Sequence, residues 1–315
     1  MACCCSIKGS SAILEVEMKI NRVIYCFVLF ILLAGCAGET GSVQEKEPAA
    51  DQKNEQVQNE RIVATTLAIA EIMDQLELDL VGAPTTSFGL PERYKETVEV
   101  GNPMQPDMEI ISTLNPDKVL SVTTLEYDLK DSFKQAGVEA DFLNLQGVEE
   151  MMETIKELGV IYHREEQAEA IFKSIESKIK EIQKETEKLD SPKVLILLGI
   201  PGSYLVATEH SYVGNLVETV GGENAIKGQS EEYISANTEY LHEADADIIL
   251  RLSHGMPEEV VEMFNEEFAT NDIWKHFKAV KNDRVYDLKE PTFATTANLN
   301  VIKALEELST LLYDK

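Results

Sequence analysis

The chain has 315 residues and a formal net charge of −28, because 56 acidic side chains outnumber 28 Lys and Arg residues. Such a surface repels polyphosphates and anionic lipid headgroups, which excludes nucleic-acid binding and electrostatic adhesion to membranes. All five cysteines lie at or before Cys36, so the rest of the chain has no framework of disulfides.

Residues 1–35 have the pattern of an export signal. Two basic residues precede the apolar run 23–33, which ends in the small residues of Leu-Ala-Gly-Cys at Cys36. This ending resembles the bacterial lipoprotein signal, in which the cysteine is lipidated and becomes the first residue of the mature protein. We therefore expect a lipid anchor that includes palmitate at Cys36, and an over-long start at residues 1–17. A membrane-anchor helix is the alternative.

A polar segment and a first α/β lobe follow. Residues 36–60 are too polar to bury a core, which predicts a disordered tether. Residues 61–163 alternate short β-branched runs with helical patterns, which predicts the first lobe. Thr65 or Thr66 is the expected N-cap of a helix that contains Leu67. The expected strands are residues 62–64, 80–81 and 118–122, and the expected loops are residues 82–87 and 101–106.

A long helix is predicted over residues 164–190. Ile171, Ile175, Ile179 and Ile182 recur at spacings of four, four and three, which places them on one helical face. A helix of this length exceeds what a small lobe needs. We interpret it as a single connection between two α/β lobes. One ordinary long helix within a single α/β domain is the alternative.

A second α/β lobe is predicted over residues 191–315. Residues 194–199 form an apolar run typical of a strand buried on both faces, and residues 248–252 form another strand. The expected loop after the first of these is 201–204, and a helix is expected over 213–220. The predicted fold is therefore two Rossmann-like lobes with mainly parallel sheets. Ligands bind at the carboxyl ends of such strands, which predicts a cleft between the lobes.

Two residues stand out as candidate ligands in these loops. The predicted strand 248–252 is followed by Ser253 and then by His254, which precedes Gly-Met-Pro. It is a candidate ligand, with a hydrogen-bonded loop histidine as the alternative. Met104 lies between two prolines in the loop 101–106, and a lone methionine is also a common apolar filler.

The arrangement of signal, tether and two lobes joined by one helix resembles the substrate-binding lipoproteins of iron-chelate and cobalamin ABC importers. Within that class, three segments resemble the heme-binding lipoproteins of iron-regulated surface determinant importers. They are PGSYLVAT at 201–208, RL at 251–252 with HGMPEEV at 254–260, and NDIWKHFKAVK at 271–281.

This resemblance implies one heme b per chain, held between the lobes. Met104 and His254 match the axial ligands of the iron, and thioether and imidazole are established heme ligands. The heme propionates would be bound mainly by backbone amides of the first lobe. Relatives have Tyr-Lys where this chain has Ser87-Phe88, which removes one side-chain cation. The positions that match the propionate-binding residues are Leu67, Ala68, Thr86, Ser87 and Phe88.

The resemblance also implies partners and a location. The protein would receive heme from upstream cell-surface donor proteins and deliver it to a membrane ABC permease with its ATPase. It would lie on the extracytoplasmic face of the bacterial membrane, held only by its lipid. The sequence has neither a Gly-x-Ser-x-Gly elbow nor a His-Glu-x-x-His motif, so we do not expect an enzyme. A ferric-siderophore or cobalamin receptor of the same class is the alternative.

Overall fold

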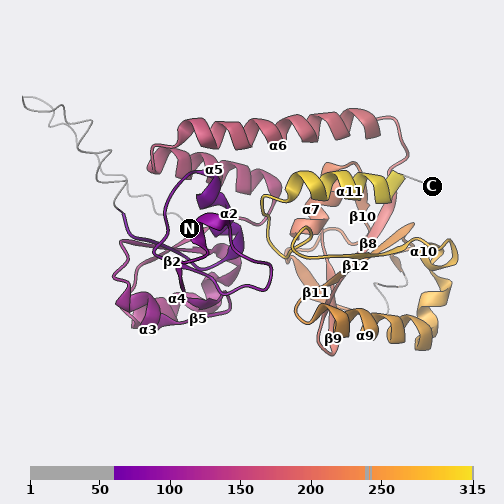
Figure 1. The fold of residues 1–315 in the computed structure, drawn as a ribbon. Helices are drawn as coiled ribbons and strands as arrows, with labels where there is room; N and C mark the ends of the chain where they lie inside the picture. Colours follow the sequence, from indigo (N-terminus) through magenta and orange to yellow (C-terminus); the bar gives the residue numbers. More distant parts are fainter. Residues whose placement is uncertain (1–59, 238–240, 242, 314–315) are drawn as a thin grey trace, which may run out of the picture. The chain divides into compact units, whose positions relative to one another are not determined.

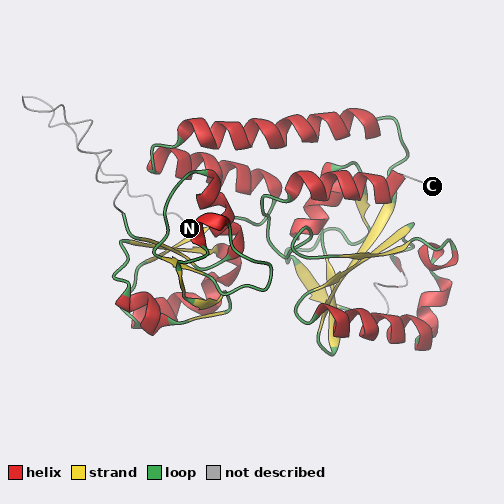
Figure 2. Cartoon of the chain, viewed as in Figure 1, coloured by secondary structure: helices red, strands yellow, loops and turns green. Residues whose placement is uncertain are grey.

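The structure is a computed structural model that describes residues 60–237, 241 and 243–313. The expected signal, Cys36 and the tether through residue 59 lie outside the described residues. The described chain is an α/β fold with two main sheets, as the sequence predicts (Figures 1 and 2). Within these ranges, no helix combines the length and the apolar character needed to cross a membrane.

The first sheet has five parallel strands in the order β3-β2-β1-β6-β7. Thr66 is the N-cap of the first helix, as expected, and its hydroxyl accepts a hydrogen bond from the N–H of Ile69. The strands are β1 (Ile62–Ala64), β2 (Gly82–Ala83), β3 (Val98–Glu99), β6 (Lys118–Val122) and β7 (Ala140–Leu143). The helices are α2 (Leu67–Gln75), η1 (Glu92–Tyr94), α3 (Met108–Thr113), η2 (Thr123–Leu125), α4 (Glu126–Gln135) and α5 (Val148–Ile161), and β4 (Gly101–Asn102) pairs with β5 (Gln105–Pro106) as a separate hairpin.

The second sheet is built around β8, with β12 and β13 parallel on one side. On the other side, β9 runs antiparallel to β8 and β11 runs antiparallel to β9, while β10 pairs in parallel with the start of β8. The strands are β8 (Lys193–Ile200), β9 (Ser203–Ala207), β10 (Glu223–Asn224), β11 (Tyr233–Ser235), β12 (Ile248–Ser253) and β13 (Val285–Leu288). The helices are α7 (Tyr212–Thr219), α9 (Pro257–Thr270), η3 (Asp272–His276), α10 (Lys278–Lys281) and α11 (Val301–Tyr313).

An aspartate just before a central strand has the same role in both sheets. Asp117 precedes β6, and its Oδ2 accepts a hydrogen bond of 2.9 Å from the N–H of Arg61, next to β1. Asp247 precedes β12, and its Oδ2 accepts a hydrogen bond of 2.9 Å from the N–H of Lys193, the first residue of β8. The repeated unit of helix, Asp and strand therefore sets how the paired strands begin in each sheet.

The helix α6 (Glu165–Thr186) connects the two halves and has 22 residues. Ile175 and Ile182 are buried on its apolar face, and Ile171 and Ile179 pack beside them, as the spacing predicts. The helix lies over both α5 and α11 (Figure 1), and Lys178 forms a 2.7 Å ion pair with Glu306 of α11. It ends at Thr186, four residues before the predicted end.

Apolar side chains fill both faces of each sheet. Along β8, Val194 and Ile196 belong to one buried cluster, whereas Leu195 belongs to another. The first of these clusters also contains residues of β1, α2, α5, α6, α7 and α11, so one continuous core runs through both halves. Each fully buried Leu or Ile contributes about 1.5–3 kcal/mol relative to exposure.

Two local predictions are wrong. The second strand pairs through Gly82 and Ala83 rather than through residues 80–81. A Cβ at Gly82 would lie 2.7 Å from Val100 and 3.0 Å from Val63, so the glycine permits a close approach and does not mark a loop. The predicted loop 201–204 is only a Pro-Gly turn, after which β9 returns antiparallel to β8.

Candidate functional site

The start of α2 offers free donors at the carboxyl end of β1. Leu67 and Ala68 are its first two residues, and Ala68 is buried whereas Leu67 is half-buried. In the described part of the chain, neither N–H has a hydrogen-bond partner, because Thr66 caps Ile69 instead. Free N–H groups at a helix N-terminus, together with the helix dipole, favour an anion such as a carboxylate.

The loop after the neighbouring strand β2 carries Thr86, Ser87 and Phe88. Ser87 and Phe88 are exposed, and the Phe88 side chain keeps 48% of its surface accessible. The Phe88 N–H donates to the hydroxyl of Thr86 at 3.2 Å. The backbone amide of Phe88 is therefore already satisfied, in contrast to those of Leu67 and Ala68.

Met104 lies at the tip of the β4–β5 hairpin and is 57% exposed. The turn is fixed by Asn102, whose Oδ1 accepts hydrogen bonds of 3.0 Å from the N–H groups of both Met104 and Gln105. Gly101 has a φ of +92°, and a Cβ there would lie 3.0 Å from backbone atoms of Gln105 and Asp107. A glycine is therefore required at the base of the hairpin.

The sheet order brings these first-half residues to one edge. The strands β3, β2 and β1 are parallel neighbours, so their carboxyl ends lie side by side. Leu67 follows β1, Thr86 follows β2 and Met104 follows β3. The hairpin is also tied to the β2 loop, because the Thr85 N–H donates to the Gly101 carbonyl at 2.9 Å.

His254 follows the carboxyl end of β12 and contacts the carboxylate of Glu290, which lies two residues beyond β13. Its N–H donates to the Gly199 carbonyl at 3.0 Å, and its ring Nδ1 lies 2.7 Å from Oε1 of Glu290. The His254 side chain is 45% exposed, whereas that of Glu290 is 15% exposed. A proton on Nδ1 that is donated to Glu290 leaves the Nε2 lone pair available to a metal.

This contact changes the acid–base behaviour of His254. The hydrogen bond to Glu290 raises the pKa of His254 above its ordinary value, and burial opposes the shift without cancelling it. The sequence alone predicts an ordinary histidine pKa near 6.5 for His254. This prediction is wrong because of the contact with Glu290. The carboxylate stabilises the imidazolium form of His254 and orients the ring when it is neutral.

An ion pair between a buried arginine and a partly exposed aspartate links the strands that precede His254 and Glu290. Arg251 of β12 and Asp287 of β13 are register partners, and Nε and Nη2 of the arginine donate to the two carboxylate oxygens at 2.7 Å each. Arg251 also donates to Asn265 of α9 and lies over the Phe264 ring. His254 and Glu290 each lie three residues beyond this pair, so their spacing is set by a rigid part of the sheet.

The two candidate axial ligands lie on different halves of the described chain. Met104 lies beyond the carboxyl ends of strands in the first sheet, and His254 lies beyond the carboxyl end of β12 in the second. No contact between the two residues is found in the described ranges. These ranges also contain no group of three or more His, Cys, Asp and Glu side chains arranged to hold a metal ion.

Glu290 is the functional candidate that sequence reasoning missed. It lies two residues beyond Leu288, which pairs with Leu252 of β12. The only local signal was its place shortly after the short strand 285–288, whose carboxyl end lies beside that of β12. Without the pairing of β12 with β13, however, nothing in the sequence distinguishes Glu290 from the many other glutamates.

Two α/β halves with loops at the carboxyl ends of their strands, joined by one long helix, define the architecture of a substrate-binding protein of an ABC importer. The family model for periplasmic binding proteins matches residues 62–292, and the chain belongs to that family.

Several relatives indicate which kind of substrate-binding protein the chain resembles. The chain is 45% identical over 298 residues to the high-affinity heme uptake system protein IsdE of Staphylococcus aureus strain Newman, which covers 94% of this chain and 99% of that protein. The crystal structure of S. aureus IsdE complexed with heme is 47% identical, with a TM-score of 0.79 over 81% of this chain and 100% of that one. An ABC transporter substrate-binding protein from Listeria monocytogenes EGD-e is 55% identical, with a TM-score of 0.78 over 81% of this chain and 99% of that one.

Proposed function

We propose that this protein is the heme-binding component of an ABC importer and that it takes up one heme b per chain. The observation that carries the proposal is the hydrogen bond between His254 and Glu290, which leaves Nε2 of an oriented imidazole free at a sheet edge. The similarity to S. aureus IsdE over nearly the whole chain supports heme as the cargo.

In this proposal, Nε2 of His254 and the thioether of Met104 bind the heme iron from opposite sides. Neither ligand adds charge to the iron, so the two propionates carry the negative charge that the protein must accommodate. The free N–H groups of Leu67 and Ala68 at the start of α2 suit one propionate. Thr86 and Ser87, in the loop after the neighbouring strand β2, offer hydroxyl and backbone donors. The amide of Phe88 already donates to Thr86, so Phe88 would contribute only its exposed ring.

The protein would act by binding and release, without chemical turnover of heme. Its relatives are named as uptake and substrate-binding proteins. We infer that it passes heme to a membrane permease with its ATPase, and that it receives heme from donors at the cell surface. A lipid at Cys36 would keep it at the extracytoplasmic face of the membrane.

The ligand assignment is tested by titrating heme into wild type, His254→Ala and Met104→Ala. Wild type should give a six-coordinate Soret spectrum at one heme per chain. Imidazole is the stronger donor to ferric iron, so His254→Ala should lose more ferric-heme affinity than Met104→Ala, and Met104→Ala should lose its thioether band in the near infrared.

Two variants serve as matched controls for this titration. Met256 is 58% exposed and lies two residues from His254, and His276 is an exposed histidine of η3. Met256→Ala and His276→Ala should keep the wild-type spectrum and affinity. If His254→Ala binds heme as wild type does, the assignment is wrong. A catecholate or corrin spectrum from the purified protein would instead favour a siderophore or cobalamin receptor.

The anchor is tested by metabolic labelling with a radioactive fatty acid. Cys36→Ala should abolish the label and release the protein from the membrane fraction, because the expected attachment atom is the Cys36 sulfur. Continued labelling of this variant would contradict the proposed anchor and leave the heme site untouched.

A further inference from the structure

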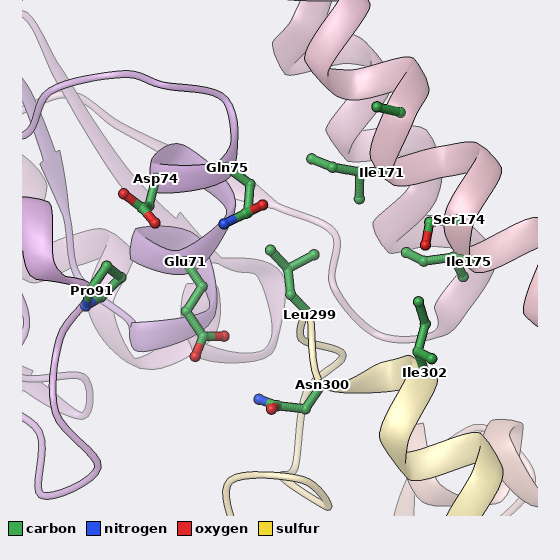
Figure 3. A pocket seen from close by; sticks show the side chains of 11 residues that line it. Glu71, Asp74, Gln75, Pro91, Ile171, Ser174, Ile175, Leu299, Asn300 and Ile302 are labelled. Atoms are coloured by element: carbon green, nitrogen blue, oxygen red, sulfur yellow. The ribbon is translucent and has the colours of Figure 1, made fainter.

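A cavity lies where three segments meet (Figure 3). One wall is α2, the second is α6, and the third is the segment that leads into α11. Its volume is about 510 Å³, within the usual range for sites that bind small molecules. None of its lining residues belongs to the proposed heme site.

The walls combine apolar side chains with a carboxyl group that lacks a partner. Ile171 and Ile175 of α6 face Leu299 and Ile302 across the cavity, and Glu71 projects from α2 toward the side where Asn300 lies (Figure 3). In the described part of the chain, the Glu71 carboxyl forms no hydrogen bond or ion pair, and its Oε2 is buried. An ionised carboxylate without a donor is costly, so a ligand that donates to Glu71 would be favoured here.

In the described part of the chain, no lining side chain donates to Glu71, although Gln75, Ser174 and Asn300 carry donors. The titratable groups among them are Glu71 and Asp74, and Asp74 already pairs with Arg93 at 3.3 Å. The segments of α6 and α11 that line the cavity contribute no charged side chain. Glu71 therefore supplies the negative charge of the cavity when it is ionised, and the apolar part of the lining comes from Ile171, Ile175, Leu299 and Ile302.

We propose that this cavity is a second binding site, for a small primary ammonium ion with a short hydrocarbon chain. The ammonium group would donate to Glu71, and the hydrocarbon would lie against Ile171, Ile175 and Leu299. Such a ligand would touch α2 of the first half, α6 and the segment before α11 of the second half, and so would bridge the two halves.

Acid should weaken this binding. Burial raises the pKa of Glu71 to about 7. The ammonium ion binds the ionised carboxylate, so a proton competes with it below that pH. Between pH 8 and pH 5.5, the ionised fraction of Glu71 falls by more than about tenfold, and affinity should fall with it.

The experiment is isothermal titration calorimetry of n-hexylammonium chloride into the heme-free protein at pH 8. Wild type should show saturable binding at millimolar concentration, and the neutral isostere hexan-1-ol should bind at least about tenfold more weakly. Glu71→Gln should also lose about tenfold or more, which corresponds to about 1.4 kcal/mol. Glu166→Gln, an equal charge change at an exposed site of α6, should bind as wild type does.

A second variant tests the cavity without altering a charge. Ala170 lines the cavity from α6 and is exposed, so Ala170→Trp should fill the space and abolish binding while leaving the fold intact. Equal binding by wild type and Glu71→Gln, equal binding of hexan-1-ol, or no saturable binding by wild type would each overturn the proposal.

Discussion

In the proposed site, His254 would bind either a proton or iron, and Glu290 would affect both equilibria. The hydrogen bond to Glu290 raises the pKa of His254, so this imidazole holds a proton to a higher pH than an ordinary histidine does. The same bond orients the ring and makes Nε2 a better donor to a metal. If His254 binds the iron as proposed, the carboxylate should strengthen heme binding at alkaline pH and raise the pH at which acid-induced heme loss begins.

We predict that Glu290→Gln weakens heme binding at pH 8 by about 10–100-fold, the range found when a hydrogen-bonding partner of a ligating histidine is replaced. Acid-induced loss of heme should begin at a lower pH than in wild type, because the pKa of His254 falls when the carboxylate is removed. Heme titrations monitored by the Soret band from pH 5 to pH 9 measure both effects. Glu258→Gln, an exposed site at the start of α9, is the matched control.

The stability of the heme-free protein provides an independent check of the same contact. Because the folded pKa of His254 is raised above its unfolded value, the stabilisation is fully present below about pH 6.5 and is lost as pH rises through the folded pKa. Glu290→Gln should therefore lower Tm more at pH 6 than at pH 9. An equal loss at both pH values would mean that the contact is not an ion pair in solution.

At the scale of elements, the β4–β5 hairpin determines where Met104 lies. Asn102→Ala removes the acceptor of two backbone N–H groups in the turn. We expect a loss of about 1–3 kcal/mol in the free energy of local opening. Faster amide exchange at Met104 and Gln105 would measure it, and heme affinity should fall several-fold because the ligand must be ordered on binding.

The saturated spectrum of Asn102→Ala should still show a methionine ligand, because the thioether itself is unchanged. Asn282→Ala, an exposed asparagine in a turn of the second half, should alter neither exchange in the hairpin nor affinity. Unchanged exchange at Met104 in Asn102→Ala would contradict the role assigned to Asn102.

The sequence predicts elements whose periodicity is long or whose caps are clear. The long helix, the strand at residues 118–122 and the N-cap at Thr66 are confirmed, because each depends on local spacing or local hydrogen bonding. The position of the second strand was predicted wrongly because Gly82 packs closely against Val100 and Val63, and these contacts are not visible in the sequence. Glu290 was missed for a similar reason, since only the pairing of β12 with β13 brings it to His254.

At the scale of the whole described chain, α6 is not the only connection between the halves. The Ala297 N–H donates to the Leu145 carbonyl at 2.8 Å, and the Val148 N–H donates to Asn215 of α7 at 3.0 Å. The continuous core from α2 to α11 adds apolar packing. Relative rotation of the halves would have to break these contacts as well as bend a helix.

We therefore predict that heme binding changes the arrangement of the halves only slightly. The radius of gyration from small-angle X-ray scattering should nearly coincide for heme-free and heme-loaded protein, because no flexible strand hinge joins the halves. Ser177→Pro, on the exposed side of α6, should kink the helix and increase the difference. A clear decrease in the radius for wild type would contradict a stiff connection.

The two aspartates before β6 and β12 also bear on how the chain folds. The hydrogen bond of Asp117 closes a loop of 56 residues, and that of Asp247 closes one of 54. Loop-closure entropy depends only on the logarithm of length, so the two closures differ by less than about 0.1 kcal/mol. Neither half has an entropic advantage in forming first. The order is then decided by the side chains buried on closure, and β8 pairs with β12 at six positions whereas β1 pairs with β6 at three. Folding should therefore nucleate in the C-terminal half, after synthesis has already delivered the N-terminal one.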